Sequence, residues 1–153
     1  MDLRNKIDEK YKEALKSKNT DEVNILRLIR SAIKDKDISN RTSDNKELVN
    51  DQQIMIVLQS MVKQRKDTIE SFKSASRDDL INKEKSEIEI INQFLPKQLN
   101  EEETKKIIEG FITKENISSI KDMGKIMGFL KKNYSGTIDL GLSGKIAKNL
   151  LIK

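Results

Sequence analysis

A cationic helical face is predicted for the segment SIKDMGKIMGFLKKNY, residues 119–134. On a helical wheel Lys121, Lys125 and Lys132 fall within about 40° of one another, whereas apolar residues such as Ile126 lie on the opposite side. Ammonium groups gathered on one face neutralise anions such as phosphates. The chemistry indicated by these residues is therefore binding of an anionic partner.

Two glycines interrupt this helical pattern. Gly124 and Gly128 fall beside the lysines on the wheel. A glycine inside a helix is about 1 kcal/mol less favourable than alanine, so two of them predict that something approaches the bare backbone closely. The approaching group is either an external one, such as a phosphate or a partner helix, or a neighbouring helix of the same bundle.

Further residues extend the same surface. Lys131, together with Lys145 and Lys148 on the polar side of the final predicted helix, enlarges the cationic area, although each lysine alone is also compatible with an ordinary solvated position. Phe129 lies off both faces, and we expect it either to stack on a base or to pack against an adjacent loop.

The distribution of charge supports an anionic partner. Residues 116–153 hold 7 Lys against 2 Asp, a net charge of 7 − 2 = +5, while residues 1–115 hold 23 Lys and Arg against 23 Asp and Glu. A neutral body with a cationic end favours nucleic acid as the partner.

Catalysis is not indicated. The chain has no histidine and no cysteine, which removes the commonest general base, the thiol nucleophile and the usual zinc ligands. GLSGKI at 141–146 is no phosphate-binding loop, because Asp139 and Ile146 occupy the positions of an essential glycine and hydroxyl. The acids at 101–103 are typical of a first helical turn. We expect no catalytic residue, metal, cofactor or small-molecule substrate.

The composition also indicates a compartment. No apolar run approaches the roughly 18 residues of a membrane span, and MDLRNKIDEK has neither a signal-peptide core nor the character of a transit peptide. We expect a soluble protein of the bacterial cytoplasm, or alternatively of an organellar matrix, without a membrane partner.

Helices must position these side chains, and the pattern predicts an all-α protein. Apolar residues recur at helical spacing in the segments that begin at Leu3, after the break at 19–21 and near Asn50. A polar loop is expected at 39–46, and a fourth helix from Asp78 or Asp79 to Leu95. Three shorter helices should follow Pro96, with starts near Asn100 and Glu103, near Ser119 and Asp122, and at Asp139.

The third and fourth helices are expected to form a long antiparallel hairpin. Leu58 pairs with Ile91 and Ile69 with Leu80 in a common register. Arg65 and Glu84 fit the same register within the apolar stripes, which predicts an ion pair between them. Two side chains that extend separately to solvent are the alternative. Such a pair fixes register more than it adds stability.

Proline divides the chain. Pro96 predicts an N-terminal helical domain over residues 1–96 and a small three-helix bundle over 97–153.

Four motifs together resemble one known family: LRLIRSAI at 26–33, VKQRKDTIESF at 62–72, EKSEIEIINQFLPKQL at 84–99 and KDMGKIMGFLKKNYSG at 121–136. They are similar to the YqeY family, free-standing relatives of the tail domain of GatB, the B subunit of glutamyl/aspartyl-tRNA amidotransferase. The resemblance spans nearly the whole chain and implies a helical N-terminal part followed by a three-helix bundle.

The resemblance also implies a partner. In the amidotransferase the related tail domain engages the tRNA elbow while catalysis occurs elsewhere, so RNA contact is expected at the matching Gly124, Lys125, Gly128, Lys131 and Lys132. In the usual GatB tail pattern a basic, alanine-containing segment follows the glycine near Gly136. Thr-Ile-Asp at 137–139 stands in its place here.

Three functions are consistent with these observations. The first is a non-catalytic tRNA-binding accessory protein of amidotransferase or aminoacyl-tRNA metabolism, with amidotransferase subunits among its partners. The second is an interaction module that docks on an acidic protein. The third is the family's label, a carbon–nitrogen ligase with glutamine as amido donor, for which the chain lacks the amidase and kinase patterns of the complete enzyme.

Overall fold

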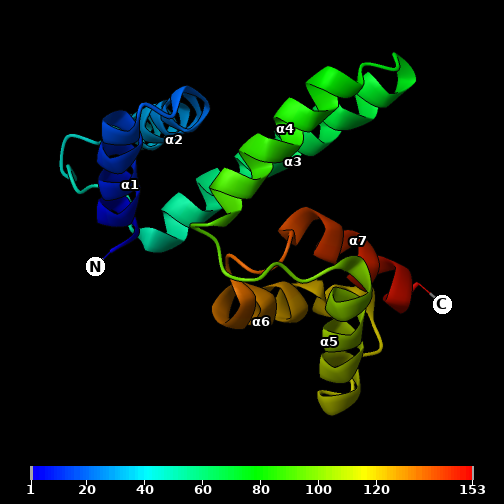
Figure 1. Ribbon diagram of the computed structural model, residues 1–153. Coiled ribbons are helices and arrows are strands. Elements are labelled where there is room, and N and C mark those ends of the chain that lie inside the picture. Colours follow the sequence, from blue (N-terminus) through cyan, green and yellow to red (C-terminus); the bar gives the residue numbers. More distant parts are fainter. Residues whose placement is uncertain (1, 153) are drawn as a thin grey trace. The chain divides into compact units, whose positions relative to one another are not determined.

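The computed structural model describes residues 2–152, and over this range all of its regular secondary structure is helical (Figure 1). The predicted all-α class is confirmed. The helices, in chain order, are α1 (Leu3–Ser17), α2 (Thr20–Ser39), α3 (Asp51–Ser74), α4 (Asp78–Asn92), α5 (Glu101–Lys114), the 3₁₀ turn η1 (Ile120–Asp122), α6 (Met123–Tyr134) and α7 (Leu140–Leu151).

The chain divides into two compact units, one ending at Leu95 and the other beginning at Pro96. Each unit has its own apolar core. In the N-terminal unit the core includes Leu26 and Ile29 of α2, Leu58 of α3 and Ile91 of α4, all without exposed surface. Because each unit has its own core, the side chains on its surface are positioned by packing within that unit.

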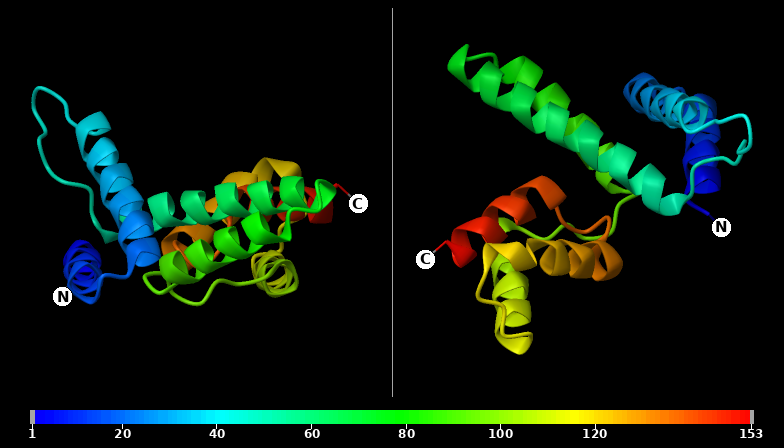
Figure 2. Two further views of the ribbon diagram at one scale, coloured as in Figure 1. Left: turned by 45° about the horizontal axis from the view of Figure 1, so that its top comes forward. Right: turned by 180° about the vertical axis from the view of Figure 1, so that it is seen from behind.

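Helices α3 and α4 lie side by side along their lengths (Figure 2). Helix α3 begins at a capping box in which Asn50 and Gln53 bond each other's backbone N–H groups. Helix α4 ends at Asn92, three residues before the predicted end, and Phe94 and Leu95 form i→i+3 turns instead. The ring of Pro96 disfavours helical backbone at Leu95, so the chain cannot continue as a helix beyond these turns.

Arg65 of α3 joins the two helices. Its Nε lies 2.9 Å from Glu87 Oε2 and 4.0 Å from Glu84 Oε2, and its Nη1 donates to the carbonyl of Met61. The nearer carboxylate therefore belongs to Glu87, which lies three residues, or slightly less than one helical turn, after the predicted partner Glu84. Both partners are mostly buried, so the arginine lies within the packed seam between the helices.

A second buried ion pair closes the loop after α2. Both guanidinium Nη atoms of Arg4 donate to the carboxylate of Asp37 at 2.9 Å, and the Val49 N–H donates to the same carboxylate. Asp37 is 6% exposed. Its charge-assisted hydrogen bonds attach the returning chain at Val49 to α1 and α2.

The C-terminal unit packs α5, α6 and α7 around Ile108, Ile126, Leu130 and Ala147, which are fully buried. Helix α5 begins at the Asn100–Glu103 capping box. Before it, the Leu99 N–H donates to the Thr137 carbonyl at 2.8 Å. That bond ties the start of the unit to the turn between α6 and α7.

The turn between α6 and α7 contains Gly136 at φ 86°, a left-handed backbone that suits glycine. Asp139 then caps α7 by accepting from the Leu142 N–H. At the other end of α6, Ser119 accepts from the N–H of Lys121, only two residues on, so the chain first makes the tighter η1 turn and α6 begins at Met123.

Candidate nucleic-acid interface

Helix α6 has a buried side and an open side. Ile126 and Leu130 have no exposed surface and anchor the helix on the core of the C-terminal unit. On the opposite side lie five exposed residues within about 120° of the helical circumference, and we call them the α6 strip. The α6 strip consists of Gly124, Lys125, Gly128, Lys131 and Lys132.

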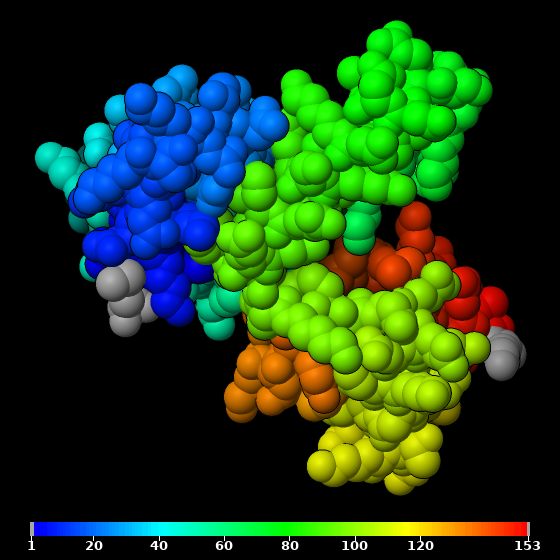
Figure 3. Space-filling model, viewed as in Figure 1, coloured from blue at the N-terminus to red at the C-terminus, as the bar shows by residue number. Residues whose placement is uncertain are grey.

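The two glycines of the α6 strip face open space. A Cβ added at Gly124 or Gly128 would meet no atom within 4 Å beyond the local helix backbone. The glycines therefore do not make room for a neighbouring helix of the bundle, which was one of the two explanations for their presence. Their backbone remains open to an external group, and Figure 3 shows that atoms of α6 (orange) reach the surface.

The lysines of the α6 strip are weakly neutralised. Of the three lysines in the α6 strip, only Lys125 has an ion pair within residues 2–152. Its Nζ lies 3.8 Å from Asp122 Oδ1, and its side chain is still 72% exposed. Exposed pairs of this kind are worth about 0–1 kcal/mol and leave the ammonium available to other anions. Lys131 and Lys132 have no ion pair within residues 2–152.

The remaining predicted contacts lie on other elements. Lys121 is exposed in η1. Lys145 and Lys148 are exposed on α7, on the side opposite the buried Ser143 and Ala147. All six predicted lysines are thus accessible, but the structure groups only three of them with the glycines on one helix.

Phe129 packs against a helix and not against a loop. Its ring stacks on Phe111 of α5 with centroids 4.2 Å apart and planes 8° from parallel, and Tyr134 meets its edge at 5.8 Å. One face of Phe129 is therefore already occupied by a protein ring.

A groove between α5 and α6 was missed by sequence reasoning. It measures about 360 Å³ and is lined by the Phe111, Phe129 and Tyr134 rings, with the charged Lys106, Lys114 and Glu115 also at its walls. Gly110 of α5 also lines it, and a Cβ there would meet nothing within 4 Å. The spacing of Lys106, Gly110 and Lys114, one turn apart each, was the available signal.

Over residues 2–152 there is no group of three or more Asp and Glu side chains that could hold a metal ion. Within the same range no helix combines the length and the apolar character needed to cross a membrane.

Comparisons with known proteins connect the chain to one family and to fungal relatives. The family model described as Yqey-like protein matches residues 4–151. An uncharacterised protein of Schizosaccharomyces pombe is 36% identical over 90 residues, 59% of this chain and 69% of the relative.

Two further relatives are named altered inheritance of mitochondria protein 41, mitochondrial. The one from Candida glabrata is 36% identical over 84 residues, which cover 55% of this chain and 44% of the relative. The one from Pyrenophora tritici-repentis is 28% identical over 83 residues, 54% of this chain and 43% of the relative. The match thus spans less than half the length of these two proteins.

Proposed function

Because the chain belongs to the YqeY family, we propose that it is a non-catalytic helical protein that binds tRNA through the α6 strip. In this proposal it assists amidotransferase or aminoacyl-tRNA metabolism, and catalysis belongs to its partners. Two relatives carry "mitochondrial" in their names, which is compatible with the organellar matrix, the alternative to the bacterial cytoplasm.

The observation that supports this proposal most strongly is the pair of open glycines among accessible lysines. Because Gly124 and Gly128 have no side chains, a phosphate oxygen can come close to the helix backbone and to the neighbouring lysine ammonium groups. Larger side chains at these two positions would keep the phosphate farther away. No contact within the described chain accounts for the two glycines, although each lowers helix stability. A phosphate backbone that docks along α6 accounts for both residue types.

The mode of recognition follows from the residue types. Residues 116–153 contain no arginine, the side chain best suited to bidentate contacts with guanine. Lysines neutralise phosphates without reading bases. We therefore propose binding with weak sequence preference and strong dependence on salt.

The glycines offer a direct test by steric block. In the Gly124→Gln and Gly128→Gln variants a neutral side chain covers the backbone, while helix propensity rises by about 0.5 kcal/mol at each position. We expect the double variant to fold with increased stability and to bind total tRNA at least tenfold more weakly, as measured by filter binding or fluorescence anisotropy.

The matched control is Gly110→Gln, which makes the same change at an open helical glycine outside the α6 strip. It should leave tRNA affinity unchanged. Normal tRNA affinity in the double variant, or an equal loss in the Gly110→Gln control, would rule out close approach of RNA to α6.

A second candidate function is docking of an acidic protein partner, and the α5–α6 groove favours it specifically. Aromatic rings beside lysines suit an acidic segment that carries an apolar anchor. In this case Gly110→Gln fills the groove and weakens capture of the partner, whereas the α6 double variant still binds it. Retention of tRNA by the purified protein distinguishes the first function from the second.

A further inference from the structure

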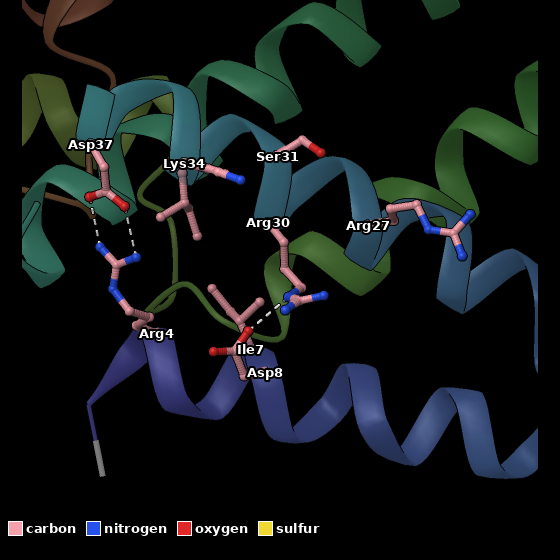
Figure 4. A pocket seen from close by; sticks show the side chains of 9 residues that line it. Arg4, Ile7, Asp8, Arg27, Arg30, Ser31, Lys34 and Asp37 are labelled. Carbon is pink, nitrogen blue, oxygen red and sulfur yellow. Dashed lines mark hydrogen bonds and ion pairs between the residues drawn. The ribbon is translucent and has the colours of Figure 1, made fainter. Parts of the chain in front are cut away.

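A groove in the N-terminal unit has no role in the proposed function. It lies along α1 and α2, measures about 360 Å³, and is lined by charged side chains over the aliphatic Ile7 and Ile33 (Figure 4). Its ionic lining consists of four cations and two carboxylates, so its net charge is 4 − 2 = +2. These residues are Arg4, Arg27, Arg30, Lys34, Asp8 and Asp37.

Both carboxylates of this groove already bind an arginine of the chain. Both carboxylate oxygens of Asp37 accept from Arg4, and one also accepts from the Val49 N–H. Asp8 accepts from Arg30 Nε at 2.8 Å. Both carboxylate charges of the groove are thus paired with arginines, and the remaining cations give it its net positive charge.

The donors are mostly unused. Arg30 is held in place through Nε by Asp8 and through its face by the Tyr11 ring, 4.4 Å from the guanidinium carbon. Within residues 2–152 its two Nη groups make no hydrogen bond, so the planar end that suits phosphate oxygens is oriented and free.

Further unused donors lie one turn to either side of Arg30. Arg27 and Lys34 line the same groove, are exposed, and have no ion pair within residues 2–152. The hydroxyl of Ser31 also lines the groove between them. The four positions, at i, i+3, i+4 and i+7, belong to one side of α2.

We propose that this groove binds a small molecule through an oligophosphate group. An oriented guanidinium flanked by two unpaired cations recognises anions. Because Arg27 and Lys34 are separated by seven residues, or about 10 Å along the helix axis, the row of donors is longer than one phosphate. The shared chemistry is a linear diphosphate or triphosphate, whether inorganic or carried by a nucleoside.

The test is calorimetric titration of the whole chain with tripolyphosphate and, separately, with ATP, each without added divalent metal and at near-physiological salt. Sulfate serves as the single-anion comparison. We expect tripolyphosphate to bind at least tenfold more tightly than sulfate. If the groove recognises only the phosphates, ATP matches tripolyphosphate; if it also contacts the nucleoside, ATP binds more tightly.

Variants locate the site. Arg27→Gln and Lys34→Gln are exposed changes that keep helix propensity, and each should weaken tripolyphosphate binding about tenfold or more. Arg30→Lys keeps the charge but loses the planar fork, and should weaken binding similarly. Lys36→Gln removes the same charge from the same helix outside the groove and is the matched control.

Three results would overturn the proposal: no binding of tripolyphosphate, an equal loss of affinity in the Lys36→Gln control, or binding of RNA to this groove with no binding of small oligophosphates. The proposal is independent of the α6 strip. The Gly124→Gln and Gly128→Gln variants should therefore bind tripolyphosphate normally, so the two proposals fail separately.

Discussion

At the scale of single residues, Asp37 is the most consequential side chain in the N-terminal unit. Hydrogen bonding from Arg4 lowers the pKa of this carboxyl, burial opposes the shift, and the Val49 N–H adds to it. The carboxylate of Asp37 accepts hydrogen bonds from Arg4, which is 33 residues away in the sequence, and from Val49, which is 12 residues away. The carboxylate therefore holds α1, α2 and the returning loop together.

The lowered pKa has a defined effect on stability. A carboxyl with a lower pKa in the folded state contributes stability that is present above its unfolded pKa, about 3.9, and lost as the pH falls through the folded value. We expect the free energy of unfolding of the wild-type unit to decrease below about pH 4.

The Asp37→Asn variant removes this contribution. It should cost about 2 kcal/mol at pH 7 and show a shallower acid dependence. The exposed Asp35→Asn change on the same helix is the control and should cost less than about 0.5 kcal/mol. The chain has two tyrosines and no tryptophan, so Tyr11 fluorescence in a Tyr134→Phe background follows this unit. Equal acid sensitivity in Asp37→Asn would contradict the assignment.

Arg65 gives a second prediction at this scale. Because Glu87 lies at 2.9 Å and Glu84 at 4.0 Å, Glu87→Gln should destabilise the unit by about 1 kcal/mol and Glu84→Gln by less than about 0.5 kcal/mol. Urea unfolding of both variants measures the difference. The reverse order would mean that Glu84 is the principal partner in solution.

At the scale of elements, the start of a helix could be predicted from the sequence where it depends on contacts between residues a few positions apart. The capping boxes at Asn50–Gln53 and Asn100–Glu103 involve residues three apart and were visible in the sequence. The early end of α4 and the η1 turn were not, because competing turns differ by small energies within one helical turn.

Helix α6 yields a prediction at the scale of the element. With open space at both glycines, Gly124→Ala and Gly128→Ala should each stabilise the C-terminal unit by about 0.8–1 kcal/mol. Thermal unfolding followed through Tyr134 in a Tyr11→Phe background measures this. Destabilisation by either alanine would show that this face is packed against protein in solution.

At the scale of the whole molecule, composition indicated the helical class and the position of the cationic segment, since both depend on sums over many residues. Grooves were not predictable in this way. The lining of the α1–α2 groove combines Arg4 and Asp8 with Arg27 to Asp37 of the next helix, and the α5–α6 groove depends on Phe111 meeting Phe129. Such neighbours are set by tertiary packing between distant segments, which periodicity alone does not specify.

The two units have separate cores, and we propose separate tasks for them: RNA contact for the C-terminal unit and oligophosphate binding for the N-terminal one. Substitutions in one unit should therefore leave the ligand of the other unaffected, because sites with no shared contacts act independently.

The salt dependence of tRNA affinity is the sharpest test of RNA binding along α6. If the three lysines of the α6 strip each displace one counterion, log K against log salt concentration has a slope of about −2 to −3, and Lys125→Gln with Lys132→Gln reduces its magnitude by about 1.5–2. The Lys36→Gln control keeps the wild-type slope. A slope near zero, or one unchanged in the double variant, would contradict binding of RNA along α6.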